Sequence, residues 1–177
     1  MKNRSGFALV LAAPLLAGCG FHPLYASNTT SGGPVGVFSN VYVDPIPERI
    51  GYELRNSLLD LMNSDVSIES ASYHLRLTVR EVREPLGFKG DASVTRYNYR
   101  LSAHYELLAR PDETLVKKGD VRAISAYNVA QSPYATVAGQ KGAEDRAAES
   151  VAERIRTELA VFFQNPQNFQ KTALAAP

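Results

Sequence analysis

The chain has 177 residues, and its 19 Lys and Arg nearly balance its 18 Asp and Glu. This length suits one domain with a substantial hydrophobic core. The near-neutral charge argues against non-specific binding of nucleic acid, which needs many cations against phosphate, so we expect no nucleic-acid partner.

Residues 1–18 have the layout of a secretory signal, with two basic residues before an apolar run from Phe7 to Leu16. This run is shorter than the about 20 apolar residues that span a bilayer. Leu16-Ala17-Gly18-Cys19 fits a bacterial lipoprotein cleavage site, which predicts that Cys19, the only cysteine, is lipidated. The alternative is a secretory signal with an incidental cysteine. Lipidation would leave no thiol for a disulfide, a metal site or a nucleophile.

The mature chain would have 159 residues, with 17 Lys and Arg against 18 Asp and Glu and a net charge of −1. Residues 19–34 are predicted to be a lipidated N-terminus and a flexible tether, because Gly, Ser and Pro bury little apolar surface. Lipoproteins kept at the inner membrane usually have aspartate after the cysteine. Gly20 therefore favours the outer membrane, with the protein held by its lipid anchor on the periplasmic side.

Residues 35–164 are predicted to form a single domain that begins with a strand over Val35–Val43, where valines recur at alternate positions. Asp44-Pro45-Ile46-Pro47 should end this strand and start a helix, with Asp44 as a candidate cap. Apolar residues at helical spacing continue that helix to about Asn63: Ile50, Leu54, Leu58 and Leu61.

Three strands should follow. Strict alternation of apolar and polar residues predicts a half-buried strand over Tyr73–Arg83. After a loop over Pro85–Asp91, a longer strand covers Ala92–Ala109. The last strand covers Thr114–Tyr127, with a predicted kink at Gly119.

Ser132 can cap a C-terminal helix with Pro133 in its first turn. Two glycines weaken the first turns, so the helix is predicted with most support from Ala143 to about Asn165, and residues 165–177 form a loose tail. An apolar stripe predicts that this helix is buried on one side. The element order β-α-β-β-β-α indicates an α+β fold with two helices packed on one face of a four-stranded sheet.

No catalytic motif is present: the sequence has neither a Gly-x-Ser-x-Gly elbow nor a glycine-rich phosphate loop. His22, His74 and His104 are far apart, which favours surface histidines over a metal pair. Four acidic residues are interpreted as solvated helix charges and not as a catalytic pair: Glu48, Glu53, Glu144 and Asp145. We therefore expect no enzyme activity, no cofactor and no metal.

One pattern favours a binding function. Four arginines, Arg76, Arg80, Arg96 and Arg100, occupy the polar positions of two successive strands, with Phe88 and Lys89 in the loop between them. Because arginine forks match phosphate geometry, this face can meet an anionic amphiphile. The alternative is a solvated face balanced by nearby acids: Glu81, Glu84 and Glu106.

The N-terminal motif Cys19-Gly20-Phe21-His22-Pro23-Leu24-Tyr25 resembles the mature N-terminus of the LPS-assembly lipoprotein family LptE, in its alphaproteobacterial form. Leu54–Leu58 in the first helix and Ala147–Leu159 in the last are also similar. The resemblance implies two helices on a four-stranded sheet. It further implies an outer-membrane lipoprotein that sits inside the LptD β-barrel, assists its assembly and helps insert lipopolysaccharide into the outer leaflet.

The resemblance also implies a lipopolysaccharide contact near Phe88 and Lys89, to which we add Arg96 and Arg100 from the basic face. A second basic position of the family, near the start of the last helix, has no clean counterpart, and Lys141 is close to it. An alternative function is an outer-membrane-tethered carrier of lipid or lipoprotein, which needs a hydrophobic cavity. A filled core with a polar sheet face would favour the barrel partner instead.

Overall fold

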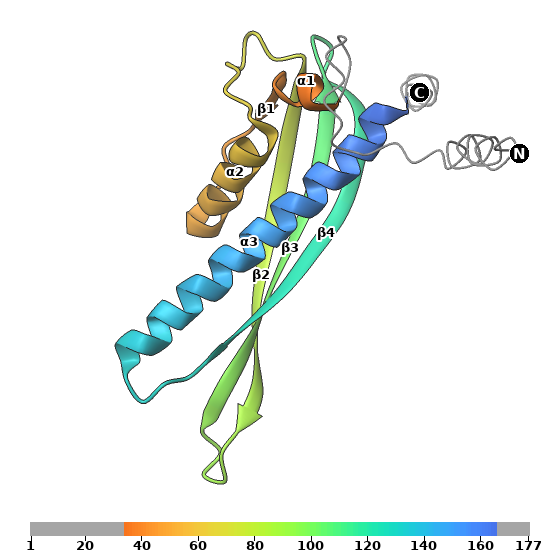
Figure 1. Ribbon diagram of the computed structural model, residues 1–177. Coiled ribbons are helices and arrows are strands. Elements are labelled where there is room, and N and C mark those ends of the chain that lie inside the picture. The colour runs from red at the N-terminus through yellow and green to blue at the C-terminus, as the bar shows by residue number, and fades with distance from the viewer. Residues whose placement is uncertain (1–33, 166–177) are drawn as a thin grey trace, which may run out of the picture.

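The computed structural model describes residues 34–165 (Figure 1). The predicted signal, Cys19, His22 and the C-terminal tail from residue 166 lie outside the described residues. The elements follow in the order α1 (Pro34–Phe38), β1 (Val41–Val43), α2 (Glu48–Met62), β2 (Tyr73–Phe88), β3 (Val94–Ala109), β4 (Thr114–Asn128) and α3 (Pro133–Gln164).

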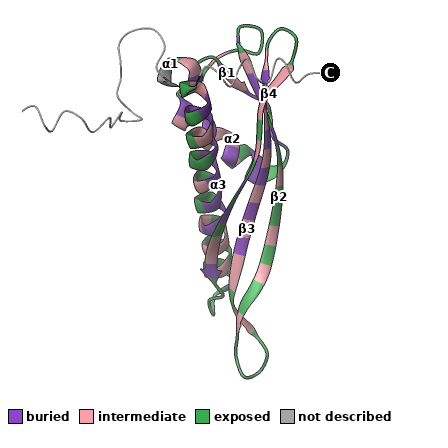
Figure 2. Cartoon of the chain, turned by 90° about the vertical axis from the view of Figure 1, so that its right-hand side faces the viewer, coloured by how far each residue is buried: buried purple, intermediate pink, exposed green. Residues whose placement is uncertain are grey.

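The four strands form one sheet in the order β1-β2-β3-β4. Strand β1 is parallel to β2, and the other two pairs are antiparallel. Helices α2 and α3 lie on the same face of the sheet, as Figure 2 shows edge-on. This confirms the predicted α+β fold, with the addition of the short helix α1.

The core fills the space between the two helices and the sheet. Its largest side chains have no exposed surface and come from both layers: Leu54, Leu58, Tyr99, Leu101, Tyr105, Leu107, Ile155 and Leu159. Tyr99 and Tyr105 belong to the apolar side of β3, as the alternating pattern predicts. Their hydroxyls donate hydrogen bonds to Glu81 and Glu158 at the border of the core.

The prediction of a first strand over Val35–Val43 is wrong in its first part, because residues up to Phe38 form α1. The buried Phe38 ring packs edge-to-face against Phe163, with ring centroids 5.7 Å apart. Burying this aromatic side chain against the end of α3 is worth more than extending a strand at the sheet edge. Of the predicted strand Val35–Val43, only Val41–Val43 pair with β2.

The predicted helix caps are also corrected. Asp44 does not cap α2, which begins at Glu48 without a side-chain cap, and its carboxylate lies 3.5 Å from Arg76. Asn63 ends α2 in the left-handed conformation with φ 50°, as its position in the sequence suggests. At α3, Ser132 makes no side-chain cap and the helix starts at Pro133, ten residues before Ala143.

The β2–β3 hairpin is longer than predicted. Strand β2 continues to Phe88, so Pro85 to Phe88 belong to the strand and only residues 89–93 form the turn. Pro85 is tolerated because it lies on an edge strand, where a missing N–H costs no sheet hydrogen bond. The predicted kink at Gly119 is also wrong: Gly119 pairs regularly with Tyr105, and the irregularity lies opposite Leu107 and Leu108.

One of the four helix acids is not solvated. Glu144 is only 6% exposed and forms an ion pair with Arg49, which joins α2 to α3. Arg49 also lies 3.8 Å from Glu53 and 3.4 Å from Asp145. This cluster therefore positions the two helices against each other.

Candidate functional site

The basic residues predicted for the polar sheet face do lie on it. Arg76 and Arg80 of β2 are opposite Glu106 and Ser102 of β3, and Arg100 follows at the same parity. These arginines differ, however, in whether an acidic side chain lies beside them. Arg100 forms a two-pronged pair with Glu84 at 2.9 and 3.0 Å, and Arg76 lies 3.5 Å from Asp44.

Arg80 forms neither a hydrogen bond nor an ion pair with any residue in the described part of the chain. The prediction that Glu81 balances the basic face is wrong, because Glu81 lies on the other face of the sheet and accepts a hydrogen bond from the Tyr99 hydroxyl at 2.7 Å. Burial and the neighbouring Glu81 carboxylate raise the pKa of Tyr99 well above its ordinary value. Glu81 therefore does not neutralise the basic face.

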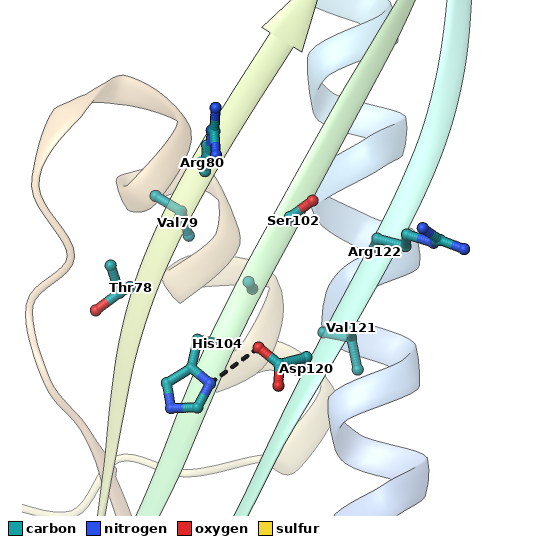
Figure 3. A pocket seen from close by; sticks show the side chains of 9 residues that line it. Thr78, Val79, Arg80, Ser102, His104, Asp120, Val121 and Arg122 are labelled. Carbon is teal, nitrogen blue, oxygen red and sulfur yellow. Dashed lines mark hydrogen bonds and ion pairs between the residues drawn. The ribbon is translucent and has the colours of Figure 1, made fainter.

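A shallow hollow of about 630 Å³ lies on this face across β2, β3 and β4 (Figure 3). Arg80, Ser102 and Arg122 form one cross-strand row along it. Arg122 was not predicted, although its alternating position in β4 marks it as facing solvent. Below this row, the His104 ring and Asp120 are linked at 2.9 Å.

The histidines are not brought together. His74 is only 3% exposed, its ring centroid lies 5.5 Å from that of Tyr42, and its ring nitrogen lies 3.3 Å from Arg110, so the prediction of a surface histidine is wrong there. His104 is a surface residue, as predicted. Within residues 34–165, no group of three or more His, Cys, Asp or Glu residues is placed to hold a metal ion.

The end of the β2–β3 hairpin carries the predicted site residues Phe88, Lys89 and Arg96. Phe88 is 61% exposed, which is unusual for a large aromatic side chain. Arg96 is exposed, and among the described residues its side chain reaches only Asn128, at 3.5 Å. Lys89 opens the turn and makes no ion pair with another described residue. An exposed ring beside two available cations can contact an amphiphile with an anionic head.

A second hollow, of about 450 Å³, lies on the helix side of the hairpin between β2 and the first half of α3. It brings together Arg83 and Lys141, neither of which forms an ion pair within residues 34–165. Glu48 and Glu81 also line it, so the hollow is mixed in charge. The sequence analysis names Lys141 as close to the second basic position of the family, but it does not predict that Arg83 lies in the same hollow.

Both hollows are on the surface and lined by charged side chains, whereas the space between helices and sheet is filled by the core. A carrier needs an apolar chamber of ligand size, and the packed core disfavours that alternative. No helix among residues 34–165 is long and apolar enough to cross a membrane.

Comparisons with known proteins find the same fold in other chains. The model of the lipopolysaccharide-assembly family LptE matches residues 38–159. A crystal structure of a putative lipoprotein from Caulobacter crescentus CB15 is 29% identical, with a TM-score of 0.63, over 75% of this chain and 99% of that chain. Rare lipoprotein B from Shewanella oneidensis shares the fold at 16% identity and a TM-score of 0.55, over 72% and 97% of the two chains. A minor lipoprotein from Acinetobacter baumannii shares it at 15% identity and 0.52, over 71% and 94%. No curated protein matches.

Proposed function

Because this chain belongs to the lipopolysaccharide-assembly LptE family, we propose that it partners the LptD β-barrel in the outer membrane. In this role it assists assembly of the barrel and insertion of lipopolysaccharide into the outer leaflet, without catalysing a reaction. The observation that carries the proposal is the family match over Phe38 to Leu159, which covers nearly the whole folded domain. The packed core supports a protein partner more than a carried lipid.

The proposed location rests on the N-terminal sequence. Cleavage before Cys19 and lipidation of its thiol would attach the domain to the periplasmic side of the outer membrane. Stable anchoring takes more than one acyl chain, each buried CH₂ contributing about 0.8 kcal/mol. A lipidated cysteine with an acylated amino group satisfies that condition.

The proposed lipopolysaccharide contact is the hairpin end, with Phe88 against an acyl or sugar surface and Lys89 and Arg96 toward phosphate. Both cations lack a carboxylate partner among the described residues, so binding an anion breaks no ion pair. Arg100 is the weakest member of the proposed site, because an anion must compete with Glu84 for its guanidinium. Arg83 and Lys141 offer further cations on the other side of the hairpin.

The test is a double charge reversal, Lys89→Glu with Arg96→Glu, and measurement of affinity for purified lipopolysaccharide. We expect at least about a tenfold loss of affinity, because attraction becomes repulsion at two positions. Wild-type binding should also weaken as salt rises, since screening acts over about 8–10 Å. The matched control is Lys117→Glu with Lys118→Glu, the same charge change at the far end of β4.

Co-purification with the barrel separates the two parts of the proposal. We expect the Lys89 and Arg96 variant to retain the barrel. Equal lipopolysaccharide affinity in this variant and the wild type would show that the hairpin cations are only a solvated surface. Loss of the barrel would place them in the protein interface instead.

A further inference from the structure

Strand β4 is the last strand of the sheet, so its outer edge has no strand beside it within residues 34–165. Two hydrogen bonds show which backbone groups face that edge. The N–H of Val129 donates to Thr95 on the β3 side, and the C=O of Ala126 accepts from Arg146 of α3 on the outer side. Because strand residues alternate and the β3–β4 register is regular from residue 119 to residue 128, the even-numbered residues direct their N–H and C=O groups outward.

This edge is protected at both ends but not in its middle. Two lysines lie just before the middle stretch, and lysines on an edge oppose the approach of another strand. After it, the Arg146 guanidinium occupies the carbonyl of Ala126 at 3.3 Å. Between these ends, three residues have outward N–H and C=O groups without a hydrogen bond to any described residue: Asp120, Arg122 and Ile124. We call the stretch Asp120–Ile124 the open edge.

A hollow of about 540 Å³ lies between the open edge and α3. Figure 1 shows the upper half of α3 running beside β4 along this part of the sheet. The hollow is lined from both elements, by Asp120, Val121 and Arg122 of β4 and by Glu153, Arg154, Thr157 and Glu158 of α3. Many peptide-recognition domains bind an extended peptide at such an edge, because main-chain hydrogen bonds supply affinity and pockets for alternate side chains supply specificity.

Two of the three acids in this hollow are already engaged. Asp120 is linked to the His104 ring at 2.9 Å, and Glu158 accepts a hydrogen bond from the Tyr105 hydroxyl. The third acid, Glu153, is exposed and forms no ion pair within residues 34–165. The hollow therefore has one available carboxylate.

Both arginines of the hollow are available, one from each side. Arg122 and Arg154 are exposed and form neither a hydrogen bond nor an ion pair with a described residue. Figure 3 shows Arg122 directed away from Ser102 and past β4, toward the position that an added strand would take. Two available cations against one carboxylate favour an acidic side chain beside Arg122. Ile124 is 60% exposed on the same side of β4, so an apolar neighbour would bury it.

We propose that the open edge binds an extended segment of a partner protein, which adds a strand beside β4. The segment carries a carboxylate opposite Arg122 and an apolar residue opposite Ile124, so that both side chains lie on the outer face of the sheet. The residue between them faces α3, on the side of Arg154. The inference concerns the folded domain and does not rest on the proposed function.

The first test titrates a blocked peptide, Thr-Val-Thr-Glu-Thr-Val-Thr, into the isotope-labelled full chain in detergent. The peptide reads the same in both directions, so its glutamate can face Arg122 and a valine can face Ile124 in either strand orientation. We expect saturable binding, with the largest shifts of amide resonances at Arg122 and Ile124. A control peptide with lysine in place of glutamate should bind at least about tenfold more weakly, because it places like charges opposite each other.

The second test uses two substitutions that separate backbone pairing from charge. Ile124→Pro removes an outward N–H and no hydrogen bond to β3, so we expect it to abolish peptide binding, whereas Ile124→Thr keeps the N–H and should retain binding. Arg122→Glu should reverse the preference, so that the lysine peptide binds more tightly than the glutamate peptide. Arg80→Glu is its matched control, because Arg80 lies in the same cross-strand row, is equally unpaired among the described residues and belongs to β2.

Three results would overturn the proposal. One is the absence of saturable binding at millimolar peptide. Another is equal affinity of the wild-type chain for the two peptides. The last is binding by Ile124→Pro as tight as by Ile124→Thr, with circular dichroism showing that both variants are folded. If Ile124→Pro does not fold, Arg122→Glu decides, because an unreversed preference for the glutamate peptide would equally refute pairing at this edge.

Discussion

Replacing Gly119 with alanine tests how tightly the sheet packs under α3. Gly119 stands directly opposite Tyr105 in the β3–β4 ladder. A Cβ atom at this glycine would lie 2.7 Å from both Cε1 and the hydroxyl oxygen of Tyr105, closer than real Cβ contacts allow. The Tyr105 ring is 0% exposed, and its hydroxyl donates to Glu158 of α3. The ring therefore has no free direction in which to move.

The expected cost follows from two opposing effects. Overpacking a filled core by one carbon costs about 1–3 kcal/mol, whereas removing a glycine from a strand favours folding by about 0.4–1 kcal/mol. We expect Gly119→Ala to lower the free energy of unfolding by about 1–2 kcal/mol. For a domain of this size, that corresponds to a decrease in Tm of roughly 3–8 °C.

The assay is urea unfolding of the variant beside Gly90→Ala, a control in the hairpin turn whose added Cβ meets nothing within 4 Å. In a Tyr105→Leu background, which removes the ring, the cost of Gly119→Ala should nearly vanish. If Gly119→Ala is as stable as Gly90→Ala, or if its cost persists without the ring, the contact with Tyr105 is not what requires glycine.

Three further predictions use other parts of the chain. Leu54→Asp and Ile155→Asp should each unfold the domain in a thermal melt, because both side chains are 0% exposed and an unpaired buried carboxylate costs several kcal/mol of a total of about 5–15 kcal/mol. Cys19→Ser should abolish acyl labelling and leave the circular dichroism unchanged, since the residue precedes the folded domain; persistent labelling would contradict the lipoprotein assignment. Burial and Glu158 raise the pKa of Tyr105, so its neutral form stabilises the fold fully below the ordinary pKa of about 10. Stability should therefore fall as pH rises above about 10, and Tyr105→Phe should weaken that fall in urea unfolding at high pH.

The sequence was sufficient for the elements whose hydrophobic pattern is long and regular. The alternation in β3 and the apolar stripe of α3 both reflect burial on one side, so they predict the layers and the faces. It was insufficient where a short segment is decided by a distant contact. The alternating valines before Val43 favour a strand, but Phe38 belongs to helix α1. Its ring packs against Phe163, which is distant in sequence and lies near the end of α3. Similarly, the sequence around Glu144 predicts a solvated helix charge, whereas the structure shows an ion pair between Glu144 and Arg49 of α2.

In the candidate site, too, the sequence predicts which face a residue occupies but not which residue it pairs with. Parity along a strand correctly assigned Arg80 and Arg100 to one face, because side chains alternate strictly. It did not show that Arg100 is paired with Glu84, whereas Arg80 has no hydrogen-bond or ion-pair partner among residues 34–165. That difference depends on the register between β2 and β3, which places Glu84 beside Arg100 and only Ser102 opposite Arg80. In a hairpin the register is set by the turn and the loop length, and the turn lies at residues 89–93 and not in the predicted loop over Pro85–Asp91.

The distinction between paired and available cations decides which residues can serve an anionic ligand. An exposed ion pair contributes little to stability, with a typical value of about 0–1 kcal/mol, so Glu84 does not hold Arg100 irreversibly. A ligand phosphate must nevertheless displace that carboxylate before it gains Arg100, whereas it meets no competing carboxylate at Lys89 and Arg96 in the described part of the chain. The hairpin end is therefore the first place at which an anionic head is expected to bind. Arg100 gains importance only if the ligand extends along the sheet. If so, Glu84→Gln should strengthen lipopolysaccharide binding by releasing Arg100, and an unchanged affinity in that variant would confine the contact to the hairpin end.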